Sequence, residues 1–342
     1  MSTTTTETVQ NTYPQTLQPQ NEQSFLKSLE GKNVEPLWKV MNQLIPELPV
    51  PKAVPNIWRF NEIRPLLIDA GEIVSAEDAD RRVLMLINPA LREAPMCKTT
   101  DTLYAGLQHI NTGETASAHR HSAFALRFII EGNGGWTGVQ GTRLTMERGD
   151  VLITPRRDWH DHGKEGNGPM IWLDGLDLPF FREFPVNFTD EYSESRYPSS
   201  PVVDTPLKYP WKDVQKALDS KPGDHAIYDY ISKVDNVSPV STVIGAQAER
   251  VGPKASSPPR LENSSFIFHV VVGKGYTVMK LVKGETKTIY WEGKDTFCIP
   301  SWTEFQHFNL TDETTYLYNF NDTPLLTNLA IHKSGKSGRL VE

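Results

Sequence analysis

The sequence carries two short histidine-rich stretches: Ala118–His121 reads AHRH, and Trp159–His162 reads WHDH. Side chains alternate between the two faces of an extended strand, so the two histidines of the first stretch point the same way and the arginine between them points away. The second stretch follows Gly149 and Pro155, which predict a turn and then a corner in the chain. The pattern predicts two strands of a small antiparallel β-barrel with a metal ion inside.

Three of these histidines, His119, His121 and His160, are the predicted metal ligands. Neutral imidazoles suit a borderline divalent ion such as Fe(II), Mn(II) or Zn(II). Three protein ligands on one side of an octahedral ion leave the other positions open for a bidentate substrate and O2. Open-sided sites of this kind favour Fe(II) that activates O2.

The two stretches resemble the metal-binding motifs of the cupin superfamily. The first motif begins at Gly113 and ends at Gly132, and the second begins at Gly149 and ends at His160. The glutamate that usually completes the cupin ligand set is absent, because Phe124–Leu126 fills that region. The resemblance therefore implies three histidine ligands and no carboxylate.

An internal repeat lies in the second half of the chain. Phe128–Gly134 (FIIEGNG) matches His269–Gly275 (HVVVGKG), and Ile153–Pro155 matches Cys298–Pro300. The repeat predicts a bicupin, a mainly β fold of two double-stranded β-helix (jelly-roll) barrels with an N-terminal helical arm.

The repeat also shows what stands at the metal positions of the second barrel. Counting from the matched glycine and proline places these residues there: Arg260 for His119, Glu262 for His121, and Phe305 for His160. Only Glu262 is a metal-ligand type, so we predict a metal-free second barrel and one Fe(II) per chain. His307 falls at the position of His162, where we expect a hydrogen-bonded structural histidine.

Composition predicts the remaining organisation. Residues 1–23 are rich in Thr, Gln and Asn and are predicted to be a disordered tail. The predicted divisions after it are 24–98, a helical arm and first strand; 99–185, the metal-bearing cupin; 186–238, a linker; and 239–342, the degenerate cupin. Two short helices are expected between Glu22 and Leu48, with further helices over Asn61–Ile73 and Trp211–Leu218 and a strand over Val83–Ile87.

Charge, hydropathy and cysteine content argue against nucleic acid as a partner, against a membrane span and against secretion. The formal net charge of the 342 residues is −7 and no basic cluster stands out, which argues against nucleic acid. No apolar run approaches the ~20 residues that a membrane span needs, and the first residues do not form a secretory signal. Cys97 and Cys298 are far apart and fit free thiols in a reducing compartment. We therefore expect a soluble cytoplasmic protein.

Several further stretches narrow the resemblance. They are Arg81–Leu84 with Asn88–Pro89, Leu103–Gln108, Arg127–Phe128 and Trp172–Asp177. The chain resembles the gentisate 1,2-dioxygenase family, whose bicupin group includes salicylate and 1-hydroxy-2-naphthoate dioxygenases. The match is specific from about Pro36 to Phe181 and weaker beyond. It implies one Fe(II) in the first barrel, opening of the ring of an ortho-hydroxy aromatic acid with O2, and a homotetramer.

Arg127, His162 and Asp174 are the remaining candidates for chemistry. Arg127 lies an even number of residues from His121, so it points inward, where it needs an anion: a substrate carboxylate or an internal pair with Asp174. His162 shares the face of His160, and it serves either as a proton or hydrogen-bond partner or as a structural histidine. Asp174 orients Arg127 or His162, or contacts the substrate.

Tyr104, Gly106 and Gln108 share one inward face of a predicted strand. Gln108 is placed to hydrogen-bond a ring hydroxyl and Gly106 to leave space for the ring, with ordinary strand packing as the alternative. Arg81 is assigned only by the resemblance, as a second contact for the substrate carboxylate.

Gentisate, opened to maleylpyruvate, is the favoured substrate, because Tyr104 and Asp161 resemble the gentisate members of the family. The alternatives are salicylate or 1-hydroxy-2-naphthoate within the same family, a non-catalytic metal-binding bicupin, and a cupin isomerase or hydrolase that uses Zn(II) or Mn(II).

Overall fold

The computed structural model describes residues 21–79, 81–93 and 95–335, which form two units divided between Pro49 and Val50. The first unit holds the two short helices that the sequence predicts, α1 (Glu22–Ser28) and α2 (Leu37–Leu44). Asn21 caps α1 by accepting the Ser24 N–H at 2.9 Å. Most of the predicted disordered tail lies outside the described residues.

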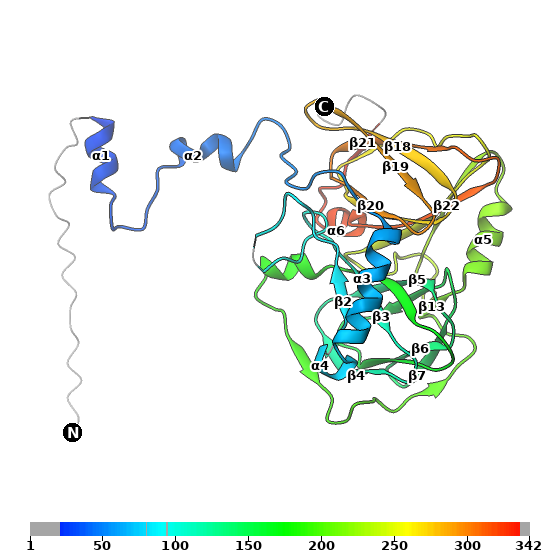
Figure 1. Ribbon diagram of the computed structural model, residues 1–342. Helices are drawn as coiled ribbons and strands as arrows, with labels where there is room; N and C mark the ends of the chain where they lie inside the picture. The colour runs from blue at the N-terminus through cyan, green and yellow to red at the C-terminus, as the bar shows by residue number, and fades with distance from the viewer. Residues whose placement is uncertain (1–20, 80, 94, 336–342) are drawn as a thin grey trace, which may run out of the picture. The chain divides into compact units, whose positions relative to one another are not determined.

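The second unit contains two eight-stranded barrels, each made of two four-stranded sheets that extra strands extend (Figure 1). The outer sheet of the first barrel consists, in order, of β11 (Thr189–Glu191), β4 (Thr115–His121), β9 (His160–Lys164), β6 (Gly135–Val139), β7 (Thr142–Met146) and β12 (Ser200–Pro201). Its inner sheet consists of β13 (Lys208–Tyr209), β8 (Val151–Thr154), β5 (Ala125–Glu131), β10 (Met170–Leu176), β3 (Tyr104–Ile110) and β2 (Val83–Met85).

The second barrel repeats this plan. Its inner sheet consists of β1 (Asn56–Trp58), β20 (Thr296–Ile299), β17 (Phe266–Val272), β22 (Thr315–Asn321), β15 (Gly245–Val251) and β14 (His225–Asp229). Its outer sheet consists of β19 (Thr286–Glu292), β18 (Lys274–Lys280), β21 (Thr303–Asn309), β16 (Arg260–Glu262) and β23 (Ser334–Gly335).

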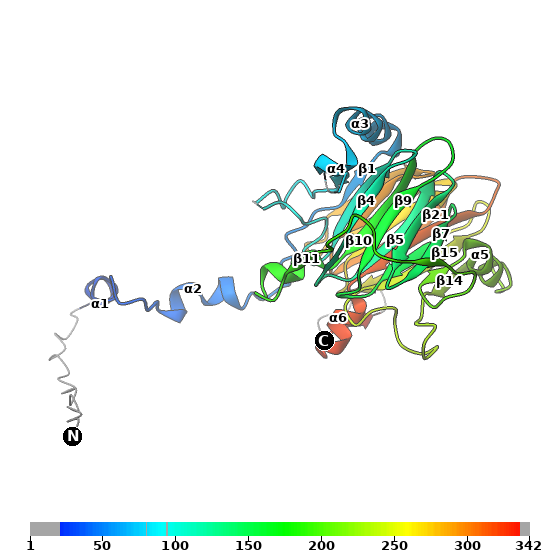
Figure 2. The ribbon, with the colours of Figure 1, turned by 90° about the horizontal axis from the view of Figure 1, so that it is seen from below.

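Helices lie outside the strands or in the connections. They are α3 (Phe60–Ile73), α4 (Ala76–Ala79), the 3-10 helix η1 (Leu178–Arg182), α5 (Trp211–Asp219) and α6 (Thr323–Asn328). Figure 2 shows α3 and α5 well apart on the outside of the strand layers. The predicted helices over 61–73 and 211–218 are thus confirmed within a residue, whereas β2 is two residues shorter than the predicted strand.

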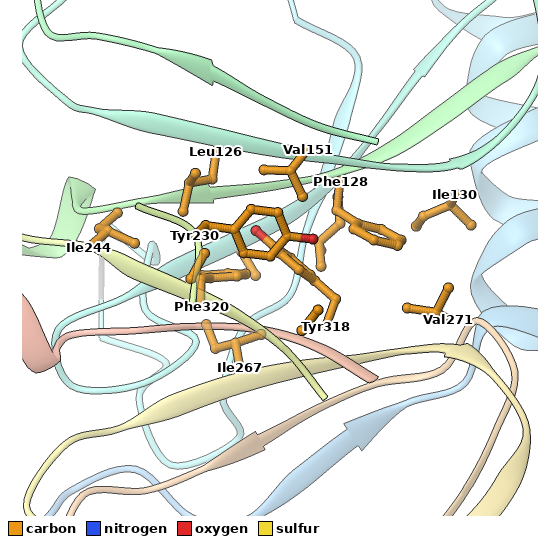
Figure 3. Packing of buried hydrophobic residues seen from close by; sticks show 14 of the residues in the cluster. Leu126, Phe128, Ile130, Val151, Tyr230, Ile244, Ile267, Val271, Tyr318 and Phe320 are labelled. Carbon is orange, nitrogen blue, oxygen red and sulfur yellow. The ribbon is translucent and has the colours of Figure 1, made fainter. Parts of the chain in front are cut away.

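The two inner sheets pack face to face and share one hydrophobic core (Figure 3). Leu126 and Phe128 from β5 meet Ile267 from β17 and Tyr318 and Phe320 from β22 in this cluster. Phe128 and Tyr318 stack with ring centroids 4.6 Å apart. Each fully buried side chain of this size contributes about 1.5–3 kcal/mol, so the shared core holds the barrels together.

The strand register agrees with the alignment of the two barrels that the internal repeat gives without gaps. His119 lies opposite His160, and Arg260 lies opposite Phe305. The corners before the second strand of each pair also match: Arg157 (φ 66°) donates its backbone N–H to the His121 carbonyl at 2.9 Å, and Trp302 (φ 59°) donates to the corresponding Glu262 carbonyl at 3.0 Å.

Both cysteines are free, as the sequence predicts, and the structure shows that both are buried. No helix among the described residues is long and apolar enough to cross a membrane.

Candidate active site

Two neighbouring strands of the first barrel bring the three predicted ligands together. β4 carries His119 and His121, and its antiparallel neighbour β9 begins with His160. One ring nitrogen from each histidine lies within 4.8 Å of the others. This is the only group of three or more potential metal-ligating side chains so placed among the described residues.

Backbone carbonyls fix the orientation of these imidazoles. Nδ1 of His121 lies 2.9 Å from the Ala123 carbonyl, and Nδ1 of His160 lies 2.9 Å from the Asp158 carbonyl. A proton on Nδ1 then donates to the carbonyl and leaves Nε2 as the lone-pair donor. Nε2 of His160 is buried without a hydrogen-bond partner among the described residues, which fits a nitrogen reserved for a metal ion.

Burial keeps the imidazoles of His121 and His160 neutral. Desolvation, with Arg127 nearby, lowers the pKa of His121 to about 4 and that of His160 well below its usual value. An imidazole must be deprotonated to bind a metal. His121 and His160 are therefore in their ligand-competent form at neutral pH.

A cavity of about 420 Å³ opens onto the three ligands. The predicted site residues that line it are Arg81, Tyr104, Gln108, Arg127, His162 and Asp174. Small-molecule cavities in proteins are typically about 300–1,000 Å³, so this one can hold a single aromatic acid.

Arg127 and Asp174 form the internal pair that the sequence left open. Nε of Arg127 lies 3.2 Å from Oδ1 of Asp174, and both side chains are almost fully buried. Arg127 also donates to Thr154, and Nε1 of Trp172 donates to the other Asp174 oxygen at 3.0 Å. Both members of the pair line the cavity. Asp174 therefore fixes the guanidinium of Arg127 in place, and the guanidinium can still contact a molecule bound in the cavity.

Burial shifts the pKa values of several cavity groups. The pKa of His162 is lowered well below its usual value, first by desolvation and then by Arg127. Desolvation raises the pKa of Asp174 to about 6, against the opposing effect of Arg127, and it raises the pKa of Tyr104. At neutral pH the cavity therefore presents a neutral imidazole and a protonated phenol. Nδ1 of His162 is buried and has no hydrogen-bond partner in the part of the chain that the structure describes.

Gly106 does not line the cavity and acts through its neighbours. A Cβ at this position would lie 2.5 Å from the Tyr104 hydroxyl and 2.6 Å from Cγ1 of Val83. The missing side chain lets Tyr104 fold back over the strand. The sequence suggested that Gly106 leaves space for the ring of the substrate; the structure shows that it shapes the wall beside that space.

Arg81 lies at the edge of the ligand set. Its guanidinium donates to the Ser117 carbonyl at 2.7 Å and also contacts Nδ1 of His119. It lines the same cavity as Arg127, so the cavity has two guanidinium groups in its wall.

Several cavity residues were missed from the sequence. They are Val83, Ala123, Ala125, Leu176, Leu178, Asn187, Phe188 and Thr189. Ala125 and Arg127 share one face of β5, so strand alternation could have found Ala125, whereas Ala123 lies in the turn between β4 and β5. Thr189 belongs to β11, which pairs with β4 opposite His121, and the irregular connection before it carries no periodic signal.

The matching positions of the second barrel hold an ion pair. Nε of Arg260 lies 2.6 Å from Oε1 of Glu262, and the guanidinium lies over the ring of Phe266. Nδ1 of His307 lies 2.8 Å from the Thr277 hydroxyl, the hydrogen-bonded role that we expected.

Comparison with known proteins agrees with this geometry. Residues 106–176 match the cupin domain family. Gentisate 1,2 dioxygenase 1 of Aquipseudomonas alcaligenes is 33% identical over 324 residues, covering 86% of this chain and 91% of the relative. A 5-aminosalicylate 1,2-dioxygenase of Comamonas sp is 32% identical over 336 residues, covering 88% of this chain and 86% of the relative.

Solved structures match over the same length. The salicylate 1,2-dioxygenase of Pseudaminobacter salicylatoxidans superimposes with a TM-score of 0.83 at 29% identity, over 93% of this chain and 98% of that one. The bicupin fold, the histidine site and the extent of these matches lead to one conclusion. The chain belongs to the gentisate 1,2-dioxygenase family and is a ring-cleaving dioxygenase.

Proposed function

We propose that this chain opens the ring of gentisate (2,5-dihydroxybenzoate) with O2 to give maleylpyruvate, using one Fe(II) held by His119, His121 and His160. The ring opens between the carboxyl-bearing carbon and the neighbouring hydroxyl-bearing carbon, and both oxygen atoms of O2 end in the product. We further propose that the enzyme works in the cytoplasm as a homo-oligomer.

The observation that supports this proposal best is the presence of a metal-ligand set and Arg127 in one cavity. A planar guanidinium binds a carboxylate at two points, and Arg81 adds a second cation to the wall. A substrate whose carboxylate is anchored there presents its adjacent hydroxyl beside the three imidazoles. The relatives named for gentisate and for 5-aminosalicylate act on substrates of this class.

The three imidazoles fit Fe(II), because their nitrogens converge within 4.8 Å and because those of His121 and His160 are neutral and oriented by backbone carbonyls. When bound, Fe(II) supplies the redox link between an electron-rich ring and O2. Gentisate suits this chemistry because its two para-related hydroxyls make the ring easy to oxidise.

The other cavity residues bind and orient the ring. Asp174 fixes Arg127 from behind. Tyr104 keeps its proton, because burial raises its pKa, and can donate a hydrogen bond. Gln108 offers a buried neutral amide to a ring hydroxyl.

His162 is proposed to hold and move a proton during ring opening. It is neutral at pH 7 because its pKa is lowered, so one ring nitrogen donates and the other accepts. A buried group that can do both is suited to the proton transfers that accompany ring opening.

Oxygen consumption by protein loaded with Fe(II) under anaerobic conditions tests the proposal. Gentisate should consume one O2 per ring, whereas 2,5-dihydroxytoluene, which lacks the carboxylate, should not react. Protein loaded with Zn(II) should bind gentisate without opening it, since zinc has no redox chemistry.

The panel also includes salicylate and 1-hydroxy-2-naphthoate. Ring opening of either of these, with gentisate inert, would reject the substrate and keep the reaction class. Absence of oxygen uptake with every member of the panel would reject the proposed activity for this chain.

A further inference from the structure

The four sheets of the two barrels have eight edge strands, and these differ in whether a further strand pairs with them. Each barrel has two four-stranded sheets, and therefore four edge strands. Seven of the eight edges are covered by an additional strand of the same chain: β1, β2, β11, β12, β13, β14 and β23. Within the described residues, β19 is the one barrel edge strand without a second neighbour.

The matching edge strand of the first barrel, β7, is covered by a further strand of the same chain. β7 is the counterpart of β19, since each pairs with the strand that follows the repeated glycine. β12 covers β7: Ser200 donates to the Gly141 carbonyl at 2.9 Å, and Val202 donates to the Arg143 carbonyl at 3.2 Å. An uncovered edge instead presents a row of backbone donors and acceptors and is a template for another strand.

β19 has the composition of a strand that pairs. It reads TKTIYWE, with β-branched and aromatic residues at most positions. Its outer face is exposed, and Tyr290 is 60% exposed. The ring of Tyr290 lies 5.4 Å from that of Tyr276, which stacks on Phe308 at 4.7 Å. An aromatic row therefore runs across the outer sheet to the open edge.

β23, the last described strand, lies at the opposite edge of this five-stranded sheet, next to β16.

We propose that β19 pairs antiparallel with β19 of a second copy of this chain, about a two-fold axis at Ile289. A two-fold axis perpendicular to the sheet places one residue of β19 opposite the same residue of the partner strand. All seven residues of β19 find a partner only when that residue is Ile289, the central one. Thr288 then faces Tyr290 of the partner subunit, and Thr286 faces Glu292 of the partner subunit. Aromatic and β-branched side chains form favourable cross-strand pairs.

The charges of β19 are compatible with this register. Lys287, which forms an ion pair with Glu285 at 2.6 Å, faces Trp291 of the partner subunit. No pair of like charges stands directly opposite, a placement that destabilises antiparallel strands. The strand is thus self-complementary over its full length.

Paired charge variants test the interface, because Thr288 and Tyr290 are exposed and stand opposite each other only across the proposed axis. T288K/Y290K places two like-charged pairs across the axis and should lower the oligomeric mass measured by analytical ultracentrifugation. T288K/Y290E carries the same first change but places opposite charges together, and it should retain the mass of the unmodified protein. A monomeric unmodified protein, or equal masses for the two variants, would overturn the proposal.

Disulfide trapping gives a second, independent measurement. T288C/Y290C should form a covalent dimer under mild oxidation, whereas each single variant should not, because its cysteine faces a native side chain. The native cysteines are buried and should not contribute. The proposed function places ring opening in the first barrel, so oxygen uptake should be equal in all variants. Absence of crosslinks in T288C/Y290C with normal oxygen uptake would reject the interface and leave the proposed function intact.

Discussion

The two barrels have the same strand register and different interiors. Arg127 pairs with Asp174 across β5 and β10, while Phe268 pairs with Asn319 at the matching place in β17 and β22. The first pair lines a cavity; Phe268 instead packs among Phe297, Phe305 and Trp291 in a filled aromatic core. Backbone pairing and the shared core therefore determine the fold, whereas a few inward side chains determine whether a barrel can carry out chemistry.

The two barrels also differ at the positions of the three histidines. In the first barrel three imidazoles converge, and Nε2 of His160 has no hydrogen-bond partner among the residues that the structure describes. In the second, Arg260 supplies the positive charge itself and neutralises Glu262. A guanidinium is always protonated and cannot ligate a metal, so the position of Arg260 offers no metal ligand.

Removal of one ligand should have the largest effect. His119→Ala should reduce the metal content from about one ion per chain to near zero, because two imidazoles no longer enclose the ion. Glu262→Gln removes the one metal-ligand type at the matching positions of the second barrel and should leave the content unchanged. Metal analysis after anaerobic loading and desalting measures both, and two ions per chain in the unmodified protein would contradict a metal-free second barrel.

Arg127→Lys should weaken substrate binding although the charge is kept. Lys lacks the planar fork that grips a carboxylate at two points. A hydrogen bond to a charged group contributes about 1.5–3 kcal/mol, which corresponds to roughly 10- to 140-fold in dissociation constant. Calorimetric titration of the zinc-loaded protein with gentisate measures the change without turnover.

Arg260→Lys is a control for that prediction in the second barrel. It alters the partly buried Arg260–Glu262 ion pair, which stands at the positions of His119 and His121, and should leave substrate affinity unchanged. Unchanged affinity in Arg127→Lys as well, with lowered stability alone, would show that Arg127 only forms the internal pair with Asp174.

The sequence is most informative where one physical rule acts alone. Strand alternation is enough to place His119 and His121 on one face of β4, and the glycine–proline repeat is enough to align Arg260 and Phe305 with His119 and His160, which face each other. Arg127 points into the same cavity from β5 in the facing sheet, so its even spacing from His121 spans a turn and is not the alternation of one strand. Neither rule finds Thr189, whose place beside His121 depends on a strand added from the irregular connection. The role of Gly106 is also hidden from spacing, because it depends on the rotamer of Tyr104.

His162→Ala should keep the metal and slow turnover. The residue lies beside the ligands without being one, and changes at such positions typically cost about 10- to 100-fold in activity or metal affinity. We expect the loss in kcat, with metal content unchanged. His307→Ala alters the counterpart in the second barrel and should lower stability through its lost bond to Thr277 while leaving kcat unchanged. Loss of metal from His162→Ala equal to that from His160→Ala would show that the ligand is misplaced.

The smallest expected effect concerns the pH dependence of stability. Burial raises the pKa of Asp174 from 3.8 to about 6, so the folded protein binds a proton more tightly than the unfolded chain does. The free energy of unfolding of the unmodified protein should therefore rise, relative to that of Asp174→Asn, as the pH falls from 7 through 6 towards 4. Urea unfolding of both metal-free proteins at pH 7 and pH 5 measures this difference, in which titration of the other groups cancels.

Asn319→Asp provides the counterpart in the second barrel. It places a buried carboxylate opposite Phe268, which stands at the position of Arg127, so the pKa of the new group should be raised further than that of Asp174. Its destabilisation should be greatest at pH 7 and should diminish as the pH falls. A difference between Asp174→Asn and the unmodified protein that stays constant with pH would mean that Arg127 holds the Asp174 carboxyl fully ionised. Burial and ion pairing would then cancel at this site, and the two barrels would differ in charge pairing and not in desolvation.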